Sequence, residues 1–474
     1  MLKTKDFIGD RKFYLSVLAI SIPIMIQNGI TNLVNLLDNV MVGRLGTEAM
    51  SGVSIVNQFV FIFNLLIFGA ISAAGIFTAQ YYGKGDNEGI RQTLRFKLIL
   101  NFAIGIIGTV VFFIFADNFI NLFLHGSETS GSLSLTLELG KKYLYIMLIG
   151  LIPYAVMQAY ASTMRETGET VMPMIAGLIA VVTNLALTSL LIFGLIGFPA
   201  LGVAGAAIAT VISRFVEMAI LIVYCHKNKY RFPYIEGLYK NFRIAPKLSK
   251  NITVKGIPLM LNEFFWAIAI TMRNQCYSTR GLNAVAAQNI SSTIFNLFSV
   301  VYMSVGTGIA IILGALLGAG KLDEAKSTDK KLIGFSVVCG FGVGIMVIIS
   351  STFFPYLYNT TAEVQELAAY MMIVSAATMP FCAFANSAYY TLRSGGKVII
   401  TILFDSCYMW AIVMPTCIIM AYFTNISIHW FFAIGQALEI FKLLFGILLL
   451  KRGTWLKNLV EEENINKENE GAYV

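Results

Sequence analysis

Long apolar segments recur along this sequence of 474 residues. Their approximate ranges are 13–42, 50–82, 98–116, 143–160, 171–193, 201–225, 256–279, 284–317, 332–354, 364–390, 398–422 and 428–450. About 20 apolar residues carry a helix across the hydrocarbon of a bilayer, where helices and closed barrels satisfy their own backbone. Only 13% of the residues are charged, whereas soluble domains carry about 25%. The sequence therefore predicts an all-α polytopic membrane protein with 12 transmembrane helices.

The basic residues predict the topology. Most of the 34 Lys and Arg residues lie in the termini and the even-numbered loops, and the exceptions in odd-numbered loops are Arg44, Lys141, Lys142 and Arg280. Positive charge is retained on the cytoplasmic side, so we expect both termini in the cytoplasm. The net charge of +8 therefore indicates topology and not a nucleic-acid partner.

The chain is expected to divide at its longest basic stretch. We predict an N-terminal six-helix lobe at 1–225, a basic cytoplasmic linker at 226–255, a C-terminal six-helix lobe at 256–452 and a polar cytoplasmic tail at 453–474. The tail is polar and charged, so disorder is expected after Leu456.

An internal repeat relates the two lobes. A shift of 235 residues aligns Pro23–Asn28 with Pro258–Glu263, Asp38 with Arg273, and Gly83 with Gly318. Beyond a longer loop the shift becomes 228, which aligns Arg165 with Arg393 and Arg214 with Lys442. Six spans return each half to its starting side, so the halves have the same topology. Such parallel repeats are typical of secondary transporters, which favours a transporter over a channel.

Asp38 is the first candidate site residue. It lies in the first apolar segment, where a carboxylate is costly and marks an ion or proton site by default. A helix that enters near Phe13 reaches the far interface after about 20 residues. The alternative that Asp38 is a membrane-edge residue without a function in transport therefore stays open.

Several motifs add a resemblance. They are Pro23-x3-Gln27, Asp38-x3-Val42-Gly43-x-Leu45-Gly46, Leu201-Gly-Val-x-Gly205-Ala206, Glu263-x2-Trp266, Leu317-Gly-x-Gly-Lys321 and Arg393-Ser-Gly-Gly396. In this order, over about residues 13–450, they resemble the multidrug and toxic-compound extrusion (MATE) family, in the bacterial drug-exporter branch of the MOP flippase superfamily.

The resemblance implies two lobes that form a V around a central cavity in the bacterial plasma membrane. It implies a monomer that exports cationic or amphipathic compounds in exchange for H⁺ or Na⁺, with no other cofactor. The alternative is a flippase for lipid-linked oligosaccharides, which needs a basic cavity for pyrophosphate. Intramembrane basic residues are few, namely Arg214, Arg273 and Lys442. An enzyme is not expected, because metalloprotease and hydrolase motifs are absent from the sequence.

The resemblance also assigns candidate residues. Asp38 matches the residue that binds the coupling cation, and Asn184 matches an asparagine near it, while Thr188 stands where some relatives have a second aspartate. Asn35 is a further candidate ligand. Sodium prefers oxygen ligands, so Na⁺ at Asp38, Asn184 and Thr188 stays open beside a proton.

In the C-terminal half, Glu263 matches a family glutamate and Asp405 resembles an acid typical of this branch. The expected role of Glu263 is to attract a cationic substrate in the cavity, and that of Asp405 is proton coupling or substrate attraction. The alternatives are an interfacial glutamate and a buried, paired aspartate. We expect Lys442 to be neutralised by Glu439, three residues away on the same helix. Further candidates for the cavity are Gln158, Tyr160, Asn386, Tyr389 and Arg273.

Overall fold

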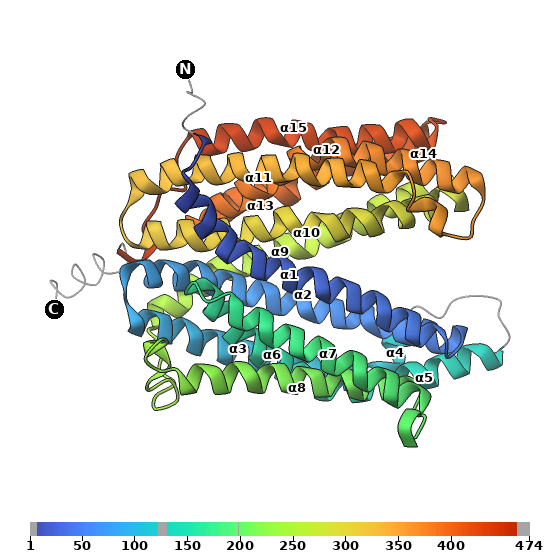
Figure 1. Ribbon diagram of the computed structural model, residues 1–474, viewed down its shortest axis with the longest axis horizontal. Coiled ribbons are helices and arrows are strands. Elements are labelled where there is room, and N and C mark those ends of the chain that lie inside the picture. Colours follow the sequence, from blue (N-terminus) through green and yellow to red (C-terminus); the bar gives the residue numbers. More distant parts are fainter. Residues whose placement is uncertain (1–6, 122–129, 198, 462–474) are drawn as a thin grey trace. The chain divides into compact units, whose positions relative to one another are not determined.

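The computed structural model describes residues 7–121, 130–197 and 199–461, and every regular element in these ranges is a helix (Figure 1). Among them, 11 helices are long and apolar enough to cross a membrane, and a bent pair brings the number to 12. The predicted all-α polytopic fold is confirmed. The spans are α1 (Arg11–Gly43), α2 (Thr47–Lys84), α3 (Asn87–Ile114), the pair α5 (Ser130–Ile149) and α6 (Leu151–Glu166), α7 (Val171–Phe193), α8 (Val203–Lys227), α9 (Pro246–Ser278), α10 (Leu282–Gly318), α11 (Leu322–Ser351), α12 (Ala362–Ser394), a composite span at Val398–Phe423, and α15 (Ile428–Lys451).

The fourth span is bent. Its two parts, α5 and α6, are bent by 45° relative to one straight helix. Together they reach beyond the predicted range of 143–160 at both ends. The break falls at Gly150, three residues before Pro153, whose ring lacks the N–H that would bond back along the helix. Arg214 of α8 donates to the Gly150 carbonyl oxygen at 3.4 Å. A charged side chain thus supports the backbone at the bend.

The eleventh span is composite. It runs through α13 (Val398–Ile402), η5 (Leu403–Cys407), η6 (Met409–Val413) and α14 (Met414–Phe423), and both η5 and η6 are π-helical. Pi-helical turns are rare and recur at functional sites. The first of the two segments, η5, carries Asp405.

Two compact units make up the chain. One, here called the C-terminal unit, comprises Met1–Met25, Ala79–Gly85 and Ile257–Val474. The other, the N-terminal unit, comprises Ile26–Thr78 and Asp86–Gly256. Parts of α1 and α2 therefore belong to the C-terminal unit, whereas the sequence division assigned residues 1–225 to the N-terminal lobe.

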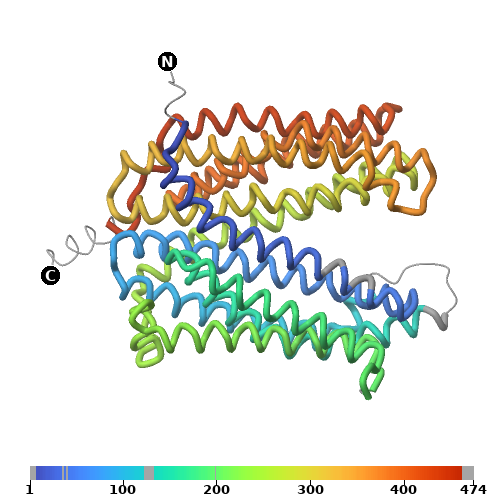
Figure 2. Tube along the Cα trace, viewed as in Figure 1, coloured from blue at the N-terminus to red at the C-terminus, as the bar shows by residue number. Residues whose placement is uncertain are grey.

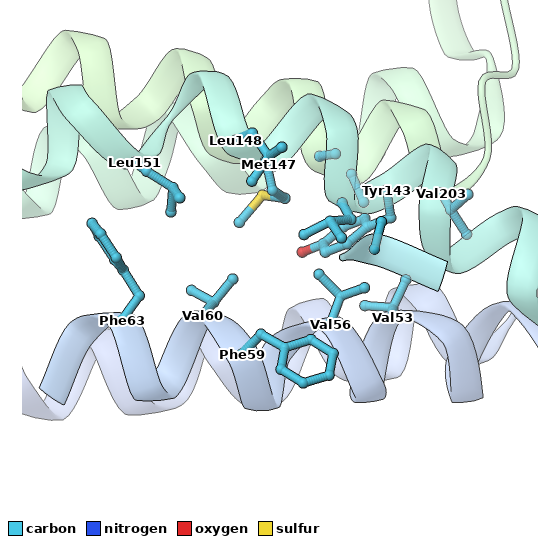
Figure 3. Close-up of a cluster of buried hydrophobic side chains, with 14 of the residues drawn as sticks. Val53, Val56, Phe59, Val60, Phe63, Tyr143, Met147, Leu148, Leu151 and Val203 are labelled. Carbon is cyan, nitrogen blue, oxygen red and sulfur yellow. The ribbon is translucent and has the colours of Figure 1, made fainter. Parts of the chain in front are cut away.

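The N-terminal unit has a continuous apolar core. Val56, Val60 and Phe63 of α2 face Met147 of α5 and Leu151 of α6, and all five side chains are at most 8% exposed (Figure 3). This packing fixes α2 beside the bent span, because close-packed interiors tolerate little displacement.

Equivalent contacts in the two units confirm the repeat. Asn101 of α3 donates to the Ala155 oxygen of α6 at 3.0 Å. Ser336 of α11 donates to the Ala383 oxygen of α12 at 3.3 Å. The shifts of 235 and 228 residues, read from the sequence, relate these two hydrogen bonds to each other.

Within the C-terminal unit, the end of α2 lies against the end of α10 (Figure 2). A Cβ atom on Gly83 would lie 1.8 Å from the Ala315 oxygen, and one on Gly318 would lie 1.9 Å from the Gln80 oxygen. Only glycine allows this backbone contact. The repeat-equivalent glycines therefore meet at one seam.

The C-terminal segment packs onto this seam. Trp455 is 2% exposed. The Gln80 amide donates to the Lys457 oxygen at 3.3 Å and accepts from the Leu459 nitrogen at 2.8 Å. The expectation of disorder after Leu456 is therefore wrong for the described part of the tail, because buried apolar side chains and Gln80 hold it. The rest of the tail lies outside the described residues.

The basic linker is also ordered. Arg95 of α3 donates to the Gly237 and Leu238 oxygens at 2.8 and 2.9 Å, and Arg91 donates to the Tyr234 oxygen at 3.1 Å. Charge-assisted bonds of this kind are the stronger hydrogen bonds in proteins. They fasten the linker to α3 within the N-terminal unit.

Candidate functional site

Asp38 and Asn184 meet in the N-terminal unit. Asp38 is partly buried near the end of α1, and Asn184 of α7 is 6% exposed. With its amide nitrogen toward the carboxylate, Asn184 donates to both Asp38 oxygens at 3.2 and 3.1 Å. Its oxygen then accepts from Thr210 Oγ1 of α8 at 3.2 Å. Three helices therefore converge on one carboxylate.

The two neighbours of Asn184 decide the orientation of its amide. Turned the other way, its oxygen would face only the accepting Asp38 oxygens and its nitrogen only the donating Thr210 hydroxyl. An amide nitrogen donates and an amide oxygen accepts, so the nitrogen lies toward the carboxylate. This arrangement suits an ionised Asp38.

A buried hydroxyl lies on the helix that carries Asn184. Thr188 lies one turn beyond Asn184 on the same face of α7 and is 1% exposed. Its buried hydroxyl has no hydrogen-bond partner among the described residues, which is costly and leaves an oxygen for a ligand. Oxygen ligands of this kind are those that a hard cation such as Na⁺ prefers. The side chain of Asn35 lies outside the described residues.

Thr210 was not singled out from the sequence. It ends the stretch of small residues that begins at Leu201. Its hydroxyl at that position could have indicated a site residue from the sequence.

Asp405 of the C-terminal unit is paired. Lys442 of α15 places its ammonium 2.6 Å from Asp405 Oδ1, and Asn262 of α9 donates to Oδ2 at 3.2 Å. This is the open alternative of a buried, paired aspartate. Lys442 was expected to be neutralised by Glu439, and that expectation missed a partner on another helix.

Glu263 and Tyr389, both predicted candidates, are in contact. Tyr389 of α12 donates its hydroxyl to Glu263 Oε1 of α9 at 2.7 Å. Arg393, one turn beyond Tyr389, also acts electrostatically on Glu263. Glu263 therefore has a hydrogen-bond donor and a nearby positive charge.

The remaining candidates lie apart from Asp38's contacts. Gln158 donates to the Tyr154 hydroxyl at 2.9 Å. Tyr160 is 1% exposed and its hydroxyl bonds to that of Tyr239. Tyr239 belongs to the linker, so Tyr160 packs beneath the linker.

Asn386 and Arg273 each keep a buried polar atom without a hydrogen-bond partner among the described residues. These atoms are Asn386 Oδ1 and Arg273 Nε. Each is available for a hydrogen bond with a ligand or water.

Comparison with known proteins places this geometry in a family. The MatE family matches residues 23–190 and 258–439. The chain is 24% identical over 451 residues to "Probable multidrug resistance protein NorM" of Thermotoga maritima, covering 94% of this chain and 93% of that protein. It is 22% identical over 408 residues to "Probable multidrug resistance protein YoeA" of Bacillus subtilis, covering 86% and 87%.

Solved structures show the same fold. One is an outward-facing multidrug resistance MATE family transporter of the MOP superfamily, with a TM-score of 0.83, 20% identity and coverage of 96% of this chain and 99% of that chain. A MOP superfamily transporter from Pyrococcus furiosus gives a TM-score of 0.82 at 20% identity, covering 95% and 98%. With the family match across both repeats, the chain belongs to the MatE family, whose members are transporters and not enzymes.

Proposed function

We propose that this protein is a secondary multidrug efflux transporter that exports cationic or amphipathic compounds in exchange for H⁺ or Na⁺. The names of its relatives support multidrug efflux. The observation that carries the proposal is the environment of Asp38, whose described hydrogen-bond partner is the neutral Asn184 amide. An ionised Asp38 therefore keeps a negative charge available to a cation, unlike Asp405 beside Lys442.

The coupling step follows from two states of one site. Ionised Asp38 accepts from Asn184 and binds the entering cation, with Thr188 and Thr210 as further oxygen donors when that cation is Na⁺. A proton instead binds to an Asp38 oxygen and removes its negative charge. The cation biases the transporter only through different affinities in its two conformations. Each entering charge supplies about 2.3 kcal/mol per 100 mV, in addition to its concentration gradient.

The proposal includes a monomer in the bacterial plasma membrane, with both termini in the cytoplasm and the lipid bilayer around it. The flippase alternative gains no support from the described contacts. Lys442 is neutralised by Asp405. Arg214 bonds to Gly150 and lies over the Tyr154 ring, with 5.1 Å to its centroid. These two cations therefore already have partners. Arg273 keeps an Nε that is unpaired among the described residues, but one such atom does not make the basic cavity that a pyrophosphate needs.

Ethidium efflux from cells that lack other exporters tests the proposal. The Na⁺ and pH gradients are varied separately, and expression in the membrane is measured for each variant. Asp38→Asn is expected to abolish efflux, whereas Asp323→Asn, an exposed acid in the first turn of α11, is the matched control that retains it. Efflux that persists in Asp38→Asn contradicts the role of Asp38.

A further inference from the structure

The C-terminal unit holds a second charged arrangement that the coupling step does not use. The Asp405–Lys442 pair described above lies within the composite eleventh span and α15. Its side chains are 16% and 12% exposed, respectively. The pair is therefore mostly enclosed but retains some access.

The carboxylate is held in place without Lys442. Asn262 donates to Asp405 Oδ2, and Ser406 in turn donates its hydroxyl to Asn262 Oδ1 at 2.7 Å. Lys442, by contrast, ends a flexible four-carbon stem with a compact point charge. The acid therefore keeps a hydrogen-bond donor even where the lysine side chain swings away.

The ammonium also lies over an aromatic ring. Lys442 Nζ is 5.1 Å from the centroid of Phe404, the residue before Asp405. A carboxylate and an aromatic face together are what recognises an organic cation, through charge and through the cation–π interaction. Lys442 thus places its own charge against the two groups that an organic cation would use, and Phe404, 3% exposed, is open to another cation only once Lys442 moves away.

The other repeat lacks an acid at the position of Asp405. The shifts read from the sequence align Asn262 with Gln27, Asp405 with Gly177, and Lys442 with Arg214. In the N-terminal unit a Cβ atom on Gly177 would lie 2.9 Å from the Gln27 amide nitrogen and 3.4 Å from Glu217 Oε1. The same two helices therefore touch at the same positions, but there the nearby carboxylate comes from α8. An acid on the eleventh span itself is particular to the C-terminal unit.

We propose that Asp405 is a binding site for a monovalent, amphipathic organic cation and that Lys442 is its tethered competitor. The incoming cation takes the place of the Lys442 ammonium against Asp405 and Phe404, while Asn262 keeps the carboxylate in position. The substrate class rests on the proposed function. Lys442 sets the affinity, because each cation must first displace it.

Equilibrium binding of tetraphenylphosphonium to the purified, lipid-reconstituted protein tests this inference, with no ion gradient present. Lys442→Met keeps the length and apolar bulk of the side chain but removes its charge. We expect it to bind the probe about tenfold more tightly, because a hydrogen bond to a charged group no longer has to be broken. Lys442→Arg is the matched control and should bind with nearly wild-type affinity. Unchanged or weaker binding by folded Lys442→Met overturns the proposal.

A second pair of variants keeps the test decisive if Lys442→Met fails to fold. Asp405→Asn removes the negative charge and keeps one acceptor oxygen, for Lys442 or for Asn262 but not for both. We expect it to weaken probe binding. Asp405→Asn/Lys442→Met should lack the tenfold gain. Wild-type affinity in Asp405→Asn, or a gain retained in the double variant, overturns the proposal. Equilibrium binding is measured without transport, so it tests this inference separately from the proposed function. If the affinities change as expected but no coupled transport is found, only the proposed function is contradicted.

Discussion

Gly318→Ala is expected to destabilise the C-terminal unit strongly. The new Cβ atom would lie 1.9 Å from the Gln80 backbone oxygen, whereas carbon and carbonyl oxygen approach comfortably to about 3.3 Å. The ends of α2 and α10 would therefore have to separate by about 1.4 Å. The obstacle is a backbone atom, so no side-chain rotation relieves the clash.

The cost follows from what that separation disturbs. Overpacking costs about 1–3 kcal/mol, and a rigid backbone obstacle favours the upper end of that range. Moving the end of α2 also stretches the hydrogen bonds of Gln80 to Lys457 and Leu459, each of which contributes about 1 kcal/mol. We expect a loss of about 3–5 kcal/mol in the free energy of unfolding.

Thermal unfolding of the detergent-solubilised protein, followed by fluorescence-detected size exclusion, measures this loss. Gly342→Ala on α11 is the matched control, because nothing lies within 4 Å of its Cβ position. Alanine is the better helix former by about 1 kcal/mol, so this control should be neutral or stabilising. If Gly318→Ala unfolds at the same temperature as the wild type, the α2–α10 seam described above is incorrect.

Three further predictions concern buried polar contacts. Lys97→Met leaves its ion-pair partner Glu166 without a cation and should lower the free energy of unfolding by about 3–5 kcal/mol. In the same thermal assay, the double variant Lys97→Met/Glu166→Gln should recover most of this loss. No recovery would contradict the pairing. Thr210→Val removes the hydroxyl that bonds to Asn184 and should reduce ethidium efflux by about tenfold at normal expression. Thr210→Ser keeps a hydroxyl and should retain efflux. Efflux by Thr210→Val equal to that of the wild type would contradict a role for the hydroxyl. Arg280 donates to four backbone oxygens at the end of α14, so Arg280→Lys should destabilise by about 1–3 kcal/mol, and an unchanged unfolding temperature would refute this role.

The fold class was predictable because apolar length alone decides which segments can span a bilayer. The repeat was predictable as well, and the Asn101 and Ser336 hydrogen bonds confirm its register. The bend at Gly150 and the two π-helical stretches were not predicted, because hydropathy is insensitive to how a helix is hydrogen-bonded. The docked tail was missed since its buried residues, such as Trp455, are few among polar neighbours.

The candidate site was predicted in part. The resemblance to the MATE family assigned Asp38 and Asn184 to one site, and the structure places the two side chains in contact. The partner of Asp405 was missed, because sequence spacing identifies neighbours on one helix, such as Glu439 and Lys442. Asp405 and Lys442 lie on separate spans, and only tertiary packing joins them.

The central claim is that Asp38 binds the ion whose entry drives export. Ion movement across the membrane of proteoliposomes on addition of an exported cationic dye tests it most directly, with external Na⁺ and pH monitored separately and no membrane potential imposed. The account predicts dye-dependent movement of one of these ions in the direction opposite to the dye, and no such movement in reconstituted Asp38→Asn. Equal dye-coupled ion movement by Asp38→Asn and the wild type would contradict it.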